Sequence, residues 1–237
     1  MFKPSVYPEV NDIHEALASL SDNKKREILL RFFKTGKGEY GEGDEFMGVT
    51  VPQIRGVARH FGHLSFDVLD GLLRQPIHDM RLCALIILVG MARKGVTKEM
   101  LDFYLLHTDC INNWDLVDCS APAIVGRYLE DKPRDLLDRL AASPVLWENR
   151  IAMVATLHLI RLGQLEDTYR LALRLMGHPH DLIHKATGWM LREAGKRDEG
   201  RLADFVEAHR AEMPRTMLRY AIEKLSPGER RRLMRRD

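Results

Sequence analysis

Residues 145–162 read VLWENRIAMVATLHLIRL, and this stretch decides the class of fold. The turn signals Ser143-Pro144 and Gly163 bound it, and its apolar residues recur at three- and four-residue spacing with no sustained alternation. Between Ile151 and Leu157 nearly every residue is apolar, which is the pattern of a helix buried on most sides. The stretch therefore predicts a buried helix rather than a strand.

The helical pattern continues on both sides of this stretch, with short turns marked by proline or glycine. Thr50-Val51-Pro52-Gln53 has the form of a capping box and predicts the start of a helix that runs to His60. The glycines between residues 36 and 48 predict a loop before it. The other helices are expected at residues 12–20, 23–33, 65–74, 77–93, 97–106, 111–129, 133–141, 165–176, 180–195, 198–209, 212–224 and 226–236.

Helices of even length joined by short turns favour an all-α fold, an α-solenoid of antiparallel helix pairs, over the competing globular bundle. The pairs recur roughly every 35–45 residues, the period of HEAT and armadillo repeats. The sequence has no composition break and no long linker, so residues 1–237 are predicted to form a single domain of HEAT-like repeats. Such a solenoid curves and presents a concave groove that suits a long partner.

The composition is that of an ordinary folded protein. Of the 237 residues, 45% are hydrophobic and 30% are charged, which excludes wholesale disorder. The formal net charge of +2 is too small to indicate nucleic acid by itself, so the distribution of charge has to carry that argument.

The cysteines and the apolar stretches indicate the compartment. Cys83, Cys110 and Cys119 contain no C-x-x-C pair and are odd in number, which argues against a disulfide framework. Residues 1–5 lack the apolar core of a signal peptide, and the apolar stretch 82–91 is too short to span a bilayer. We expect a cytoplasmic protein that does not enter a membrane.

The segment 112–118, NNWDLVD, carries the first candidate site. Trp114 and Asp118 are four residues apart and therefore share one face of a helix. Asp115 is rotated from Trp114 by about 100°, and its role stays open between support of the site and packing. A carboxylate beside an indole face suggests a site that favours a developing positive charge.

A second candidate lies in the helix expected at residues 180–195 and just beyond it. Lys185, Trp189, Arg192 and Lys196 are four, three and four residues apart, so they form one stripe. Lysine and arginine neutralise phosphates, and the indole offers a flat face for a base or a sugar. The alternative is a solvated helix face with a half-buried tryptophan.

The third candidate is Arg150, near the start of the buried helix. An arginine there has to reach solvent or pair with an acid, and Asp115 and Asp118 are the candidate partners. The alternative is a structural ion pair. Trp147, by contrast, is expected to pack in the core.

A metal site is not expected. His178, His180 and His184 gather in the sequence, but a zinc site requires further ligands and supporting groups, and no cysteine lies nearby. Polar surface histidines are the better interpretation.

The chain resembles the AlkD family of DNA alkylation repair glycosylases, which are all-helical proteins of HEAT-like repeats. The resemblance covers nearly the whole chain. The segments that carry it are 46–55 (FMGVTVPQIR), 113–118 (NWDLVD), 148–150 (ENR) and 188–193 (GWMLRE).

The resemblance implies an enzyme of base excision repair. It would hydrolyse the N-glycosidic bond of cationic N3- and N7-alkylpurines, such as 3-methyladenine and 7-methylguanine, in double-stranded DNA. The implied catalytic carboxylate is Asp118, with Trp114 and Trp189 contacting the sugar and Arg150 in support, while Arg55 would contact DNA. With no catalytic lysine evident, we expect a monofunctional glycosylase that acts as a monomer and needs no cofactor. The cations of the 185–196 stripe, Lys185, Arg192 and Lys196, are expected to bind the DNA backbone.

Two other functions compete with this one. A non-catalytic HEAT-like module that binds branched or damaged DNA would use the same basic groove but release no base. A protein–protein scaffold, a common use of helical repeats, would present an apolar or mixed concave face instead.

Overall fold

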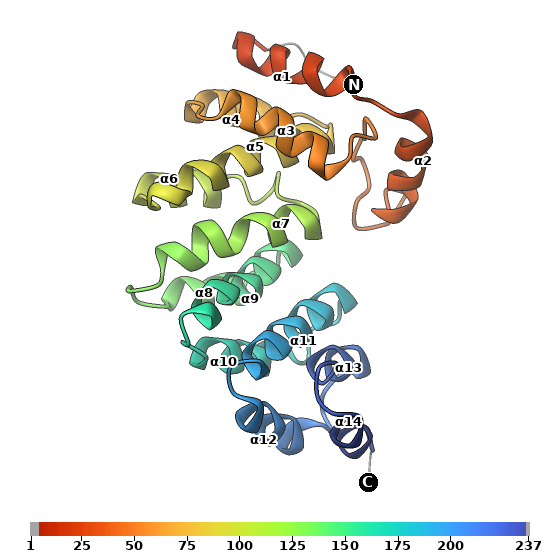
Figure 1. Ribbon diagram of the computed structural model, residues 1–237, viewed down its shortest axis with the longest axis vertical. Helices are drawn as coiled ribbons and strands as arrows, with labels where there is room; N and C mark the ends of the chain where they lie inside the picture. The colour runs from red at the N-terminus through yellow and green to blue at the C-terminus, as the bar shows by residue number, and fades with distance from the viewer. Residues whose placement is uncertain (1–4, 236–237) are drawn as a thin grey trace. The chain divides into compact units, whose positions relative to one another are not determined.

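The computed structural model describes residues 5–235, and 14 α-helices dominate this part of the chain (Figure 1). The predicted all-α fold of helical repeats is confirmed. In the described range, β-type pairing is limited to an isolated bridge between Glu45 and Ile77. The chain separates into two compact units, residues 1–120 (unit 1) and 121–237 (unit 2).

Unit 1 is organised around α5 (His78–Met91), which is buried along most of its length. The helices α1, α3 and α4 pack against α5, and α1 also contacts α3 and α4. The apolar run 82–91 is thus core. The remaining elements of the unit are α1 (Pro8–Ala18), α2 (Asn23–Phe32), α3 (Val51–Phe61), α4 (Phe66–Leu73), η1 (Ala92–Lys94), α6 (Lys98–Leu106) and the greater part of α7 (Trp114–Ala121).

The glycine-containing segment between α2 and α3 is a loop, as predicted, and it is fixed to α5. The Asp79 carboxylate accepts the backbone N–H groups of Met47 at 2.8 Å and Val49 at 3.0 Å. Gly48 has a positive φ of 84°, and an added methyl group would collide with the Asp22 carbonyl. Gln53 accepts the Thr50 N–H at 3.0 Å, which confirms the predicted start of α3.

Unit 2 is organised around α9 (Leu146–Arg161) and α11 (Asp181–Gly195). The predicted burial of α9 is confirmed, and Trp147 is a core residue as expected. Helix α11 packs on α9 and on α13, each two places away along the chain, which is the pattern of stacked helix pairs. The other elements are η2 (Pro122–Gly126), α8 (Asp135–Ala141), α10 (Glu166–Leu175), α12 (Glu199–His209), α13 (Arg215–Ala221) and α14 (Pro227–Met234).

Three predicted helices differ clearly from the structure at their ends, and one of them, expected at 212–224, covers only Arg215–Ala221. The helix expected at 111–129 begins only at Trp114 and passes into a π-helical turn at Pro122, because proline has no N–H to donate to the Asp118 carbonyl four residues earlier. The first helix begins at Pro8 rather than residue 12, since proline is well suited to the first turn.

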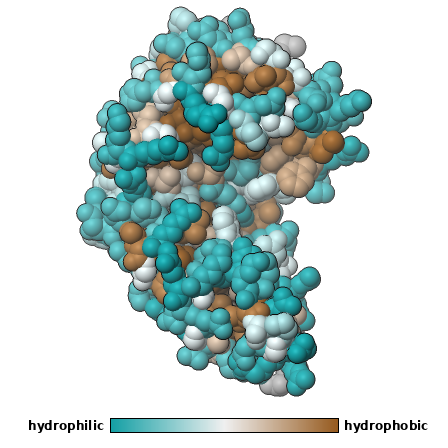
Figure 2. All heavy atoms as spheres, in the orientation of Figure 1, coloured by the Kyte–Doolittle hydropathy of each residue, from teal (hydrophilic) through white to brown (hydrophobic). Residues whose placement is uncertain are grey.

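Hydrophilic side chains cover much of the face shown in Figure 2, with hydrophobic residues in patches between them. Over the described part of the chain, none of the helices combines the length and the apolar character needed to cross a membrane.

Candidate active site

Trp114 is the first residue of α7 and is held between the start of the helix and two phenylalanines. Its backbone N–H is 2.9 Å from the side-chain oxygen of the buried Asn113. The indole stacks on Phe33, with ring centroids 5.3 Å apart and planes 18° apart. Phe32 meets the same indole edge-on at 5.8 Å, and it is 59% exposed. One side of the indole is therefore fixed by packing at the end of α2.

Asp115 belongs to a buried ion-pair network that the sequence did not reveal. His78 Nε2 donates to Asp115 at 2.8 Å, and His78 Nδ1 contacts Asp44 at 3.2 Å. Arg81 pairs with the other oxygen of Asp44 at 2.7 Å. The His78 ring also stacks on Phe46, with centroids 4.6 Å apart. The network ties the loop before α3, the start of α5 and the first turn of α7 together.

The charges in this network are fixed by their neighbours. Burial alone would lower the pKa of His78, but the carboxylates of Asp115 and Asp44 outweigh it and raise the pKa to about 8. Burial acts to raise the pKa of Asp44, but His78 and Arg81 outweigh it and lower the pKa to about 2. At neutral pH His78 is thus a cation that pairs with the Asp115 carboxylate.

Asp118 is the other carboxylate of α7, and it is half-buried. It lies on the Trp114 side of the helix by spacing, four residues before Pro122, where the π-helical turn begins. Its charge acts on two neighbours. Burial is the main cause that raises the pKa of the Cys119 thiol, and the charges of Asp115 and Asp118 raise it further. Burial also raises the pKa of Tyr104, and the charge of Asp118 contributes to that increase. Cys119 is therefore a protonated, unreactive thiol. The catalytic role of Asp118 stays a prediction.

In unit 2, Arg150 is buried near the start of α9, with 5% of its surface exposed. Its Nη1 donates to the Leu182 carbonyl at 2.6 Å, in the first turn of α11. Arg150 therefore joins the starts of the two central helices of the unit.

Trp189 lies on α11, half-buried, in a cleft of about 470 Å³. An added methyl group at the preceding Gly188 would collide with the Met217 carbonyl of α13, so glycine permits the close approach of the two helices. The cleft is also lined by two arginines that the sequence reasoning missed, Arg161 and Arg197, together with Leu157, Ile160, Glu193 and Lys196.

The predicted basic stripe on α11 is present, but its cations are paired. Lys185 lies 2.9 Å from Asp181, and Lys196 lies 2.7 Å from Glu193. Arg192 pairs with Glu223 of the segment after α13. The stripe therefore carries less free positive charge than its spacing indicated, and its role in binding DNA stays a prediction.

The remaining predicted site residue, Arg55, is exposed on α3 in unit 1 and lines a separate cavity. The structure thus places Trp114, Asp118 and Arg55 in one unit. The second unit holds Arg150, Trp189 and the α11 stripe. The meeting of the two sets around one substrate stays a prediction.

The three histidines near the start of α11 are held by hydrogen bonds. His178 contacts the Asn149 side chain at 3.1 Å, and His184 contacts the His178 carbonyl at 2.6 Å. Burial lowers the pKa of His178 and of His180. No group of three or more metal-ligating side chains occurs within residues 5–235.

Comparison with known proteins connects this geometry to a family. A family described as "DNA alkylation repair enzyme" matches residues 13–225, which is most of the chain. Among solved structures, a "Predicted DNA alkylation repair enzyme from Enterococcus faecalis" is similar with a TM-score of 0.71. The match covers 87% of this chain and 97% of that one at 13% sequence identity, so it shows a shared fold. None of the curated proteins matches this chain.

Proposed function

Because the chain belongs to the DNA alkylation repair enzyme family, we propose that it is a glycosylase that hydrolyses the N-glycosidic bond of cationic N3- and N7-alkylpurines in duplex DNA. The observation that carries this proposal is the difference in surroundings between the two carboxylates of α7. Asp115 is neutralised by His78, whereas Asp118 shares a helix face with a tryptophan that Phe33 holds in place.

A carboxylate and an indole fit the charge changes of this reaction. An alkylated purine already carries a positive charge, so it leaves with the bonding electron pair as a neutral base and needs no general acid. The deoxyribose then develops positive charge at C1′, which the Asp118 carboxylate stabilises through space and the Trp114 face stabilises by cation–π attraction. Water adds to C1′, and Asp118 orients it and accepts its proton.

The second unit contributes the other proposed groups. We propose that Trp189 of α11 contacts the sugar, with Arg150 fixing the start of α11 through the Leu182 carbonyl. In this proposal the two units act as one domain and as a monomer, gripping a single duplex in a basic groove. Since water is the nucleophile, the expected product is an intact abasic site without strand cleavage.

The experiment is release of base from duplex DNA that contains a single 7-methylguanine. The supporting result is release of the free base with the strand left uncut until alkali is added. Binding of the same duplex with no release of base from it or from a 3-methyladenine duplex would favour a non-catalytic module instead.

A further inference from the structure

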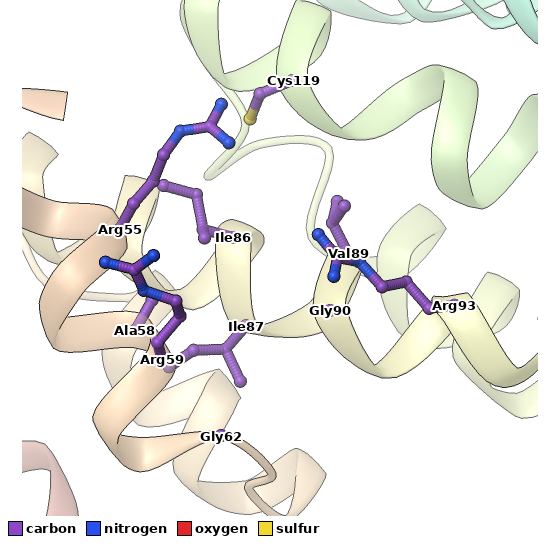
Figure 3. Close-up of a pocket in the computed structure, with 10 residues that line it drawn as sticks. All are labelled: Arg55, Ala58, Arg59, Gly62, Ile86, Ile87, Val89, Gly90, Arg93 and Cys119. Carbon is purple, nitrogen blue, oxygen red and sulfur yellow. The ribbon is translucent and has the colours of Figure 1, made fainter. Parts of the chain in front are cut away.

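A cavity of about 430 Å³ in unit 1 is lined by three arginines. Arg55 and Arg59 extend from α3, one helical turn apart, and Arg93 reaches back toward them from η1 at the end of α5 (Figure 3). Cys119 of α7 forms part of the wall near the Arg55 guanidinium (Figure 3). Two elements distant in sequence, α3 and η1, therefore contribute cations to the lining of one cavity.

These arginines have no counter-ion within the described residues. None of the three forms an ion pair with a carboxylate of residues 5–235, and the residues that line the cavity include no aspartate or glutamate. Other arginines of the unit are paired, for example Arg74 with Asp70 and Arg81 with Asp44. Three unpaired guanidinium groups around one space repel one another, and an anion in that space removes the repulsion.

The floor of the cavity strengthens such an anion site. Ile86, Ile87 and Val89 line it from α5, together with Ala58 of α3. Apolar walls beside a charged group raise the strength of its charge interactions. Guanidinium groups bind phosphate oxygens in pairs, and the volume exceeds what a lone phosphate requires, leaving room for an attached sugar.

We propose that Arg55, Arg59 and Arg93 form a phosphate pocket that holds the sugar–phosphate backbone of duplex DNA. The choice of DNA as the partner rests on the proposed function, while the pocket itself rests on the three unpaired cations. Cys119, which lines the pocket, directly follows Asp118 in α7. A backbone phosphate held here is therefore fixed relative to the proposed catalytic carboxylate without touching the reacting bond.

The test is the salt dependence of binding to an undamaged duplex, measured by fluorescence anisotropy. Each of the variants Arg59→Ala and Arg93→Ala is expected to weaken binding roughly tenfold at low salt and to reduce the slope of log K against log salt by about 1. The triple alanine variant is expected to lose about 3 from the slope. Arg59→Lys keeps the charge and should retain most of the slope.

Arg139→Ala is the matched control, because Arg139 is an exposed arginine of α8 that lines neither of the two cavities described. Its slope should equal that of the wild type. If the Arg59→Ala and Arg93→Ala variants had the same salt slope as the control, the proposed phosphate pocket would be overturned. A second measurement is the Tm with and without inorganic pyrophosphate. If pyrophosphate raised the Tm of the wild type but not of the triple variant, and the salt slopes for DNA binding were the same in both proteins, the pocket would bind small phosphates. That result would overturn its assignment to DNA.

These measurements separate the pocket from the proposed enzyme. Undamaged DNA needs no excision, so the slopes report on the pocket even if no base is ever released. If the wild type bound no duplex at all, both proposals would fail together.

Discussion

His78 and Asp115 form a buried ion pair, with 2.8 Å between Nε2 and Oδ2, that fastens the first turn of α7 to the start of α5. The helix that carries Asp118 is therefore positioned by a charge interaction as well as by apolar packing. Because this pair includes a histidine, its contribution to stability depends on pH.

We predict that the protein loses stability as the pH rises from 6.5 to 8. The pKa of His78 is raised to about 8 in the folded protein, so its stabilisation is complete below the unfolded value of 6.5 and is lost as the pH passes through 8. The corresponding loss is of the order of 2 kcal/mol. Urea unfolding at a series of pH values measures it.

His78→Gln should remove this part of the pH dependence. The exposed His63 offers a control, since His63→Gln should keep the wild-type profile. A His78→Gln protein with the same loss of stability between these pH values as the wild type would rule out the charged pair.

Asp115→Asn is predicted to lower the stability of the folded protein without directly changing the chemical step. The substitution leaves a buried imidazolium without its main partner, which costs about 3–5 kcal/mol. Thermal unfolding should therefore show a large fall in Tm for Asp115→Asn and little change for Asp118→Asn. The reverse order would mean that the supporting role belongs to Asp118.

Gly188→Ala is predicted to destabilise unit 2 by about 1–3 kcal/mol, because the added methyl meets the α13 backbone rather than a movable side chain. Gly177→Ala is the matched control, since a methyl group there meets no atom within 4 Å. Urea midpoints compare the two variants. Equal midpoints would contradict the close packing of α11 on α13.

Trp114→Ala is predicted to slow base release about 10- to 30-fold, the loss expected when a desolvated cation–π contact is removed. Trp114→Phe keeps an aromatic face and should retain most of the rate. Single-turnover assays below the unfolding temperature of each variant compare them. Equal rates for the alanine and phenylalanine variants would exclude the proposed role of the indole.

Local sequence pattern predicted the helices well, because apolar spacing and the proline and glycine turns act within a few residues. The same reasoning placed Trp114 and Asp118 on one face of a helix. The end of α7 was not predicted, because the effect of Pro122 is a π-helical turn rather than a break.

The partners of the site residues could not be predicted, because they lie far along the chain. His78 and Asp115 are 37 residues apart, and no local pattern connects a histidine after the Pro76 turn with a carboxylate of α7. The same holds for Arg192, whose spacing indicated a free cation but which pairs with Glu223, 31 residues later. Spacing predicts which residues share a face, whereas pairing depends on how the helices stack.

The catalytic role of Asp118 is tested most sharply by the single-turnover rate of 7-methylguanine release. The rate of Asp118→Asn is compared with the wild type and with Asp102→Asn, which alters an exposed carboxylate of α6. We predict a fall of about 100-fold or more for Asp118→Asn, with DNA affinity retained and with wild-type rates for Asp102→Asn. A folded Asp118→Asn protein that releases the base at the wild-type rate would contradict this role.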